Sequence, residues 1–463
     1  GGTDLCYGRY DTFEHVLRDD AESLLDQNFP GKDYSNARIA DFHDLDKPFE
    51  SMYDRKVIPR MPWHDVQMMT LGEPARDLAR HFVQRWNYLL RAKRPSRLTP
   101  LLTPPSDLTA EELKSLPMFE ILREKSTCET QILRSAGNWS LGLKETECSI
   151  QNAYLKLIEQ SEHFIYIENQ FFITSTVWNG TCVLNKIGDA LVDRIVKANQ
   201  EKKPWKAFIL IPLMPGFDSP VDTAEASSLR LIMQFQYQSI SRGEHSIFSK
   251  LKKLNIDPAQ YIQFFSLRKW STFAPNERLI TEQLYVHAKI LIADDRRCII
   301  GSANINERSQ LGNRDSEVAI LIRDTDLIKT KMNGDDYYAG KFPWELRQRL
   351  MREHLGCDVD LVEFVEKKFE RFEKFAAKNY EKLHTLSKEG DSGNNWSDRE
   401  MIDSAMIELG YREIFGCKFS PQWKSSHGNS VDDGSTQCGI NEKEVGREDE
   451  NVYEKLFNSV DYG

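Results

Sequence analysis

Residues 284–318 decide the fold, and they read LYVHAKILIADDRRCIIGSANINERSQLGNRDSEV. Apolar residues alternate over 284–292, which predicts a strand, and a second apolar run begins at Cys298. Asp294 and Asp295 lie between the two runs and are typical turn residues. We therefore expect two strands joined by a turn, with polar side chains placed at fixed positions on them.

Two basic side chains occupy the first of these strands. His287, Lys289 and Asp294 form the pattern H-x-K-x-x-x-x-D. Because residues two apart on a strand share a face, the imidazole and the ammonium should point the same way. This pair suits a phosphodiester, since the lysine neutralises the non-bridging oxygens while the histidine attacks phosphorus or protonates a leaving oxygen.

Residues beyond the second strand extend the candidate site. Ser302 and Asn304 supply hydrogen-bond donors just past the strand end. Glu317 is a candidate to hold the imidazole tautomer by accepting a hydrogen bond from the other ring nitrogen. Asp294 has a second interpretation as a turn residue, and the two interpretations are compatible. The predicted catalytic set is His287, Lys289, Asp294, Ser302, Asn304 and Glu317.

This set, with G-S-x-N at 301–304 and an acidic residue beyond it, resembles the HKD signature of the phospholipase D superfamily. The resemblance implies two such motifs at one active site, whereas this chain contains one. Residues 1–5 (GGTDL) resemble residues 301–305 (GSANI) at an offset of 300. We therefore expect the chain to start just after the first motif and to need that missing half as a partner. The fragment alone should be inactive.

Three further segments carry the resemblance and point to eukaryotic phospholipase D: P-W-H-D at 62–65, R-H-F-V-Q-R-W-N at 80–87 and Y-I-E-N-Q-F-F at 166–172. The stretch 85–97 (RWNYLLRAKRPSR) indicates the fungal branch. A polar triplet at a strand end is costly to bury unless it contacts itself or a ligand. The predicted pocket residues are Glu168, Asn169, Gln170, Trp63 and His64. For the last two, a purely structural loop remains the alternative.

A cationic cluster follows the helix expected over 72–90. It consists of Arg85, Arg91, Lys93, Arg94 and Arg97. One interpretation is a solvated helix end favoured by the helix dipole. The other is a site for anionic lipid, where each basic residue contributes roughly 1 kcal/mol. The resemblance supports the second interpretation and implies phosphatidylinositol 4,5-bisphosphate as an activator.

Composition limits the remaining functions. The formal net charge of −10 disfavours nucleic acid as a partner, because nucleic-acid binding needs a basic surface. The eight cysteines form no C-x-x-C pair or zinc pattern, so we expect reduced thiols in the cytoplasm. The resemblance implies that the chemistry needs no metal and no cofactor. No apolar run approaches the roughly 18 residues that span a bilayer, so membrane contact should be peripheral.

Strand and helix patterns alternate between 131 and 324 and predict an α/β fold with crossover connections. The resemblance specifies a mixed-sheet α/β/α sandwich of the phospholipase D type, with a complete second half, a truncated first half and a helical C-terminal region. We expect three parts. Residues 1–128 hold the remnant of the first half and a connector, 129–385 the second catalytic half, and 386–463 a loop-rich or disordered tail with a closing segment.

The resemblance implies hydrolysis of phosphatidylcholine to phosphatidic acid and choline, and transfer to primary alcohols, through a phosphohistidine. The first motif usually supplies the nucleophile, which makes His287 the general acid, with Lys289 holding the phosphate. Three alternatives remain: a nuclease of the same superfamily, a single-motif homodimer, and a non-catalytic scaffold that binds phosphoinositide membranes.

Overall fold

The computed structural model describes residues 2–19, 21–39, 42–93, 99–115, 127–216, 226–273 and 278–355. Its centre is an eight-stranded mixed sheet in the order β3-β2-β13-β12-β11-β4-β7-β8. The β4, β7 and β8 strands run parallel, and the others pair antiparallel with their neighbours. The strands of this sheet are β2 (Cys128–Ala136), β3 (Glu147–Cys148), β4 (Phe164–Asn169), β7 (Lys206–Leu210), β8 (Ile262–Phe265), β11 (Lys289–Ala293), β12 (Arg297–Gly301) and β13 (Glu317–Asp324).

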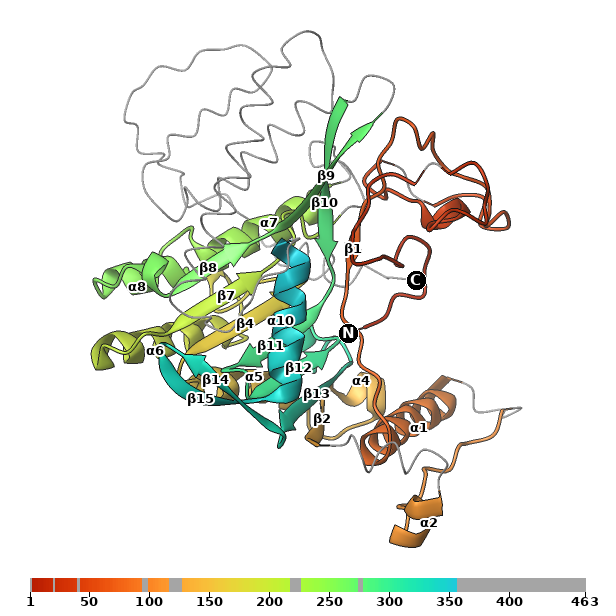
Figure 1. Ribbon diagram of the computed structural model, residues 1–463. Helices are drawn as coiled ribbons and strands as arrows, with labels where there is room; N and C mark the ends of the chain where they lie inside the picture. Colours follow the sequence, from red (N-terminus) through yellow and green to blue (C-terminus); the bar gives the residue numbers. More distant parts are fainter. Residues whose placement is uncertain are drawn as a thin grey trace, which may run out of the picture.

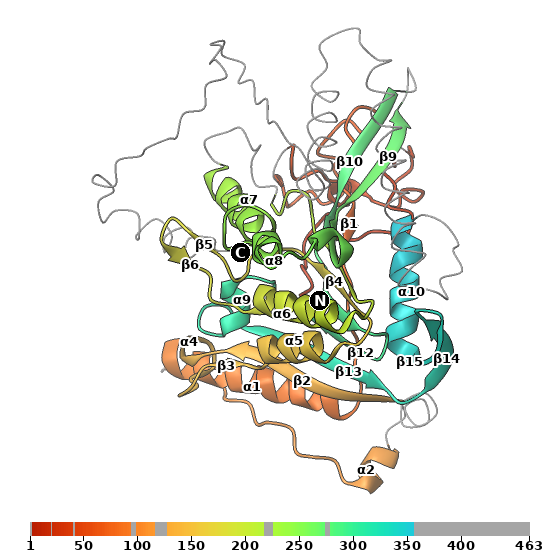
Figure 2. The ribbon, with the colours of Figure 1, turned by 90° about the vertical axis from the view of Figure 1, so that its left-hand side faces the viewer.

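Side chains alternate between the two faces of this sheet and build two separate cores. On β4, Ile165 and Ile167 join one core, whereas Phe164 and Tyr166 join the other. The first face is covered by α5 (Ser149–Gln160), α6 (Ile187–Glu201) and α8 (Ile247–Lys253), and the second by α10 (Lys341–Leu355) and the hairpin of β14 (Leu327–Met332) and β15 (Asp335–Gly340). Figures 1 and 2 show helices on both sides of the sheet. The prediction of a mixed-sheet α/β/α sandwich is confirmed.

A second, three-stranded sheet joins the N-terminal segment to the rest. It has the order β1-β10-β9, from β1 (Trp63–His64), β10 (Arg278–Val286) and β9 (Leu267–Phe273). The segment before β1 contains the short 3₁₀ helix η1 (Gly31–Asp33). It lies over one end of the large sheet, beside the upper part of α10 (Figure 1).

The remaining elements connect or cover these sheets. They are α1 (Glu73–Lys93), α2 (Ala110–Ser115), α4 (Asn138–Leu141), β5 (Val177–Trp178), β6 (Thr181–Cys182), α7 (Ser227–Ile240), η2 (Pro258–Gln260) and α9 (Glu307–Leu311). Among the described helices, none is long and apolar enough to cross a bilayer.

The strand expected over 284–292 is divided in two. β10 ends at Val286 and β11 begins at Lys289, so His287 and Ala288 link the small sheet to the large one. Apolar alternation continues through the break, which is why the sequence predicts one strand. The predicted tail 386–463 lies outside the described residues.

Candidate active site

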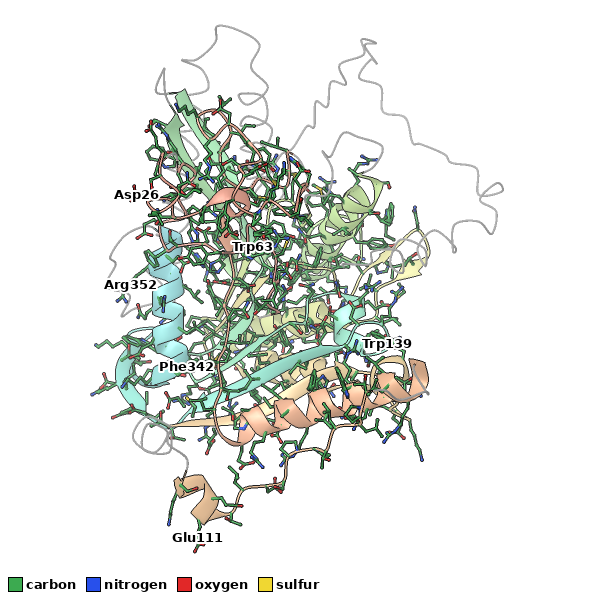
Figure 3. All side chains as sticks on the ribbon, turned by 90° about the vertical axis from the view of Figure 1, so that its right-hand side faces the viewer. Asp26, Trp63, Glu111, Trp139, Phe342 and Arg352 are labelled. Carbon is green, nitrogen blue, oxygen red and sulfur yellow. The ribbon has the colours of Figure 1, made fainter. Side chains whose placement is uncertain are left out.

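The backbone around His287 is held by the segment that contains the W-H-D sequence. β1 pairs in parallel with β10, with Trp63 opposite Tyr285 and His64 opposite Val286. The pairing continues one residue further, because the backbone N–H of His287 donates to the carbonyl of His64 at 2.7 Å. Figure 3 shows Trp63 near the centre of the molecule, where the N-terminal segment meets the sheet.

The imidazole of His287 is fixed by Asp65. Its Nδ1 donates to Oδ2 of Asp65 at 2.8 Å, while Nε2 lies 4.0 Å from Oδ2 of Asp4, beyond hydrogen-bond distance. The Trp63 ring packs beside it with centroids 5.0 Å apart. Burial lowers the pKa of His287, and the hydrogen bond to Asp65 partly opposes that shift. With Nδ1 occupied, Nε2 is the nitrogen available for chemistry.

The prediction that Glu317 holds the imidazole is wrong. Glu317 instead accepts a 2.5 Å hydrogen bond from the Ser302 hydroxyl, and burial raises its pKa to about 7. Asp65 takes the predicted role from 222 residues away in the chain. The only feature of the sequence that pointed to Asp65 was its position in the P-W-H-D segment, directly after the predicted pocket residues Trp63 and His64.

Lys289 lies inside the protein at the start of β11, with 3% of its surface exposed. Its Nζ donates to the backbone carbonyl of His287 at 2.5 Å, and its charge helps to lower the pKa of the His287 imidazole, so the two groups lie close together. Burial lowers the pKa of Lys289 to about 8, although the charges of Asp65, Glu317 and Asp4 oppose that shift. A buried ammonium beside an imidazole is suited to receive an anionic group.

Asp294 lies at the far end of β11, about 17 Å along the strand from Lys289. Its carboxylate accepts hydrogen bonds from the backbone N–H groups of Glu162, His163 and Phe164 at 2.7, 2.8 and 2.8 Å. The backbone of Asp294 is left-handed, with φ 52°. These contacts and this backbone conformation are those of a turn residue, which was the second interpretation of Asp294. Asp294 anchors the start of β4 and does not touch the site.

Asn169 and Gln170, two members of the predicted polar triplet, hold segments around the site: the loop after β12 and the strand β10. Oδ1 of Asn169 accepts from the backbone N–H of Ile305 at 2.9 Å, and Gln170 donates to the Tyr285 hydroxyl at 2.9 Å. The buried Oδ1 of Asn304 has no hydrogen-bond partner among the described residues. Asn169 and Gln170 thus stabilise the segments that surround the site. The Asn304 Oδ1 can still accept a hydrogen bond.

The N-terminal GGTD segment lies against the GSAN loop. A Cβ placed on Gly2, whose φ is 75°, would come within 3.1 Å of the Ser302 Cβ. Asp4 follows and reaches the neighbourhood of His287 Nε2, as given above. The two stretches that resemble each other at an offset of 300 are therefore neighbours at the site.

Glu168 lies in a buried chain of histidines and carboxylates. Its Oε2 accepts from His64 Nε2 at 2.6 Å and its Oε1 from His354 Nε2 at 2.7 Å. His64 Nδ1 donates to Glu353 Oε1 at 3.0 Å, and the same oxygen lies 3.0 Å from His15 Nε2. The sequence identified His64 and Glu168 but not the other three, because only the fold brings the end of α10 to β4.

The same chain offers two groups of possible metal ligands, His15–His64–Glu353 and His64–Glu168–His354, each with ligand atoms within 4.8 Å. A nitrogen and an oxygen bound to one tetrahedral zinc at about 2.0–2.1 Å are well over 3 Å apart. The observed 2.6 Å between His64 and Glu168 fits a shared proton instead. These residues, as they stand, fit a hydrogen-bonded chain better than a metal centre.

A cavity of about 520 Å³, which we call the Asp4 pocket, is lined by Asp4, Trp63 and Asp65, whereas His287 and Lys289 are not among its lining residues. Polar and aromatic side chains mix in its lining, including Asp4, Arg9, Trp63, Asp65 and Glu353. The guanidinium of Arg9 lies 4.1 Å over the Trp63 ring and bonds Asp4 at 3.2 Å. The pocket is large enough for a small polar group beside Asp4 and Asp65.

The predicted cationic cluster is described only in part. Arg85 is half-buried, donates to the Ser140 carbonyl at 3.5 Å and lies 5.6 Å over the Trp139 ring. Figure 3 shows Trp139 beside one end of α1, away from Trp63. Arg91 is exposed. The Lys93 side chain, Arg94 and Arg97 lie outside the described residues.

Comparison with known proteins gives consistent matches. The family model described as Phospholipase D matches residues 1–388. The chain is 99% identical over its whole length to Phospholipase D1 of Saccharomyces cerevisiae and covers 28% of that protein. Identity is 57% to Phospholipase D1 of Schizosaccharomyces pombe (78% of this chain, 26% of that protein) and 45% to Phospholipase D1 of Homo sapiens (70% and 30%). The chain thus spans less than a third of these relatives.

Two solved structures are similar at a low level. One is Nuc, a phospholipase D family member from Salmonella typhimurium, at 15% identity and a TM-score of 0.25, covering 49% of this chain and 93% of that one. The other is phosphatidylserine synthase of Haemophilus influenzae Rd KW20, at 14% identity and a TM-score of 0.30, covering 64% and 59%.

Proposed function

The chain belongs to the phospholipase D family, and we propose that it supplies half of the active site of an enzyme that hydrolyses phosphatidylcholine to phosphatidic acid and choline. The observation that carries this proposal is the pair formed by His287 and Lys289. Nδ1 of the imidazole is held by Asp65, Nε2 is left for the substrate, and a buried ammonium lies beside it. The second motif would come from residues outside this chain.

In the proposed reaction the histidine of the partner motif attacks phosphorus through a ring nitrogen. A P–N bond forms, the P–O bond to choline breaks, and Nε2 of His287 gives its proton to the leaving choline oxygen. Nε2 then takes a proton from water, which attacks the same phosphorus and releases the partner histidine. A primary alcohol in place of water gives a phosphatidyl alcohol. His287 is therefore general acid in the first step and general base in the second.

Lys289 would stabilise the negative charge on the phosphate oxygens. Its desolvated ammonium has a pKa of about 8, so an incoming phosphate favours the charged form. In a water-poor site this interaction is stronger than it would be at the surface. Ser302, oriented by Glu317, and the Asn304 amide are the neighbouring polar groups.

We also propose that the cationic cluster around Arg91 binds anionic lipid such as phosphatidylinositol 4,5-bisphosphate and places the protein peripherally on a membrane. The exposure of Arg91 supports the proposal, whereas Arg85 is engaged with α4. Replacing Arg91, Lys93, Arg94 and Arg97 with alanine should weaken stimulation by anionic vesicles. An unchanged stimulation curve would reject this lipid site.

The proposed activity is tested in a full-length protein that carries this chain, by measuring phosphatidylbutanol formed from phosphatidylcholine vesicles and 1-butanol. His287→Asn should lower turnover by at least 10³-fold, in the range expected for loss of a general acid and base. His163→Asn is the matched control, because His163 lies at the opposite end of β4 and bonds Asn333 at 3.1 Å. Near-normal turnover by His287→Asn would reject the role, and no turnover by the unmodified protein would reject the substrate.

A further inference from the structure

One buried histidine links the segments that surround the site. His64 is 2% exposed, and both of its ring nitrogens bond carboxylates: Glu168 at 2.6 Å and Glu353 at 3.0 Å. Carboxylates accept hydrogen bonds, so both ring nitrogens carry protons and the ring is an imidazolium. Glu168 belongs to β4 and Glu353 to α10, so the cation joins three separate elements.

The backbone of the same residue is bonded to the proposed catalytic histidine. The carbonyl of His64 accepts from the N–H of His287 at 2.7 Å, and the next residue, Asp65, accepts from its Nδ1 at 2.8 Å. The peptide that joins His64 to Asp65 therefore positions both the main chain and the ring of His287. Any shift of this peptide changes the direction of Nε2.

We propose that His64 is a positioning residue, whose charged ring, clamped between Glu168 and Glu353, fixes this peptide and thereby aims Nε2 of His287 at the leaving oxygen of the substrate. The inference rests on the proposed function for its substrate, but the aiming of His287 is a property of the chain itself. A misplacement of about 1 Å at a reacting atom can lower a rate by roughly 10²-fold.

The charges around His64 favour the protonated form of its ring. Glu168 also accepts from His354 and from the Tyr166 hydroxyl, and Glu353 also lies within hydrogen-bond distance of His15. Beyond His15, Asp11 bonds Arg60 and the backbone N–H of Trp63.

Burial alone would lower the pKa of His64, but the two carboxylates raise it to about 10. The ring is therefore charged throughout the range in which His287 titrates.

The test replaces His64 with glutamine in the full-length protein, with His163→Gln as the matched control. We expect His64→Gln to lower kcat roughly 10- to 100-fold with little change in KM, because the substrate contacts remain and the aim of Nε2 is lost. The decisive measurement is an NMR titration of His287 in both variants. Because Asp65 raises the pKa of His287, a displaced Asp65 should lower it in His64→Gln only.

Glu353→Gln keeps an acceptor oxygen while removing one clamping charge, and it replaces His64→Gln if that variant does not fold. It should shift the His287 titration in the same direction by a smaller amount. An unchanged His287 titration in a folded His64 or Glu353 variant would overturn the proposal, whatever the activity. A stoichiometric metal ion in the unmodified protein that is lost in His64→Gln would also overturn it. Failure of the unmodified protein to release choline, with the titration shift present, would reject only the substrate.

Discussion

Asp65 and His287 are 222 residues apart in the chain, yet Oδ2 of Asp65 accepts a 2.8 Å hydrogen bond from Nδ1 of His287. The contact exists because β1 extends the small sheet in parallel with β10 and ends where β10 ends. A two-residue strand thus determines which nitrogen of the imidazole is held by Asp65.

Asp65→Asn should lower kcat by roughly 10²- to 10⁴-fold, because an amide can present its N–H to Nδ1 and favour the wrong tautomer. The pKa of His287 should fall, since Asp65 is the hydrogen-bonded group that raises it. The pH profile of kcat measures both effects. Asp77→Asn on the surface of α1 is the control. Equal profiles for the two variants would show that Asp65 does not control His287.

Because the pKa of Lys289 is about 8, we expect kcat/KM to fall as the pH rises through that value, where the free enzyme loses the buried positive charge. Lys289→Arg keeps a charge at every working pH, so the limb near pH 8 should be absent in its profile, although the larger group lowers the rate. The limb at lower pH, from loss of the acid proton of His287, should remain in both proteins. Initial rates between pH 6 and 10 compare the two proteins. The prediction fails if both profiles fall together near pH 8.

Asp294→Ala should reduce the free energy of unfolding by about 1–3 kcal/mol, because the buried backbone N–H of Phe164 and the part-buried contacts to Glu162 and His163 lose their acceptor. Turnover per folded molecule should be unchanged. Urea unfolding measures the first quantity and an activity assay on the folded fraction the second. Asp336→Ala removes an exposed ion pair with Lys329 and should leave the free energy of unfolding almost unchanged. A selective loss of turnover in Asp294→Ala would restore a catalytic role.

The alternation of apolar residues was enough to predict most of the large sheet and its helices. The helices α5 and α6 and the strand β13 all lie in the span 131–324, where the sequence predicts alternating strands and helices. The spacing of apolar residues along the chain indicates which faces are buried, and each of these elements has a buried face. The division at His287 and Ala288 was not predictable in this way, because both new strands are buried and the pattern continues across the break.

The site was predictable where its residues are neighbours in the chain. His287 and Lys289 are two residues apart, and strand geometry predicts a shared site. The choice of Asp65 over Glu317 and the partners of Glu168 depend on contacts between distant segments. His354 and Glu353 are ordinary polar residues of a helix until α10 brings them to β4.

The contact of Gly2 with Ser302 has a consequence for symmetry. The two residues occupy the same position in stretches offset by 300, so a local twofold axis relating two repeats would pass between them. Such an axis exchanges Asp4 with Asn304. Asp4 lies 4.0 Å from Nε2 of His287, and its mate would then lie at a similar distance from the histidine that corresponds to His287. By the same exchange, the neighbour of that second imidazole would be Asn304, whose buried Oδ1 has no hydrogen-bond partner in the part of the chain that the structure describes.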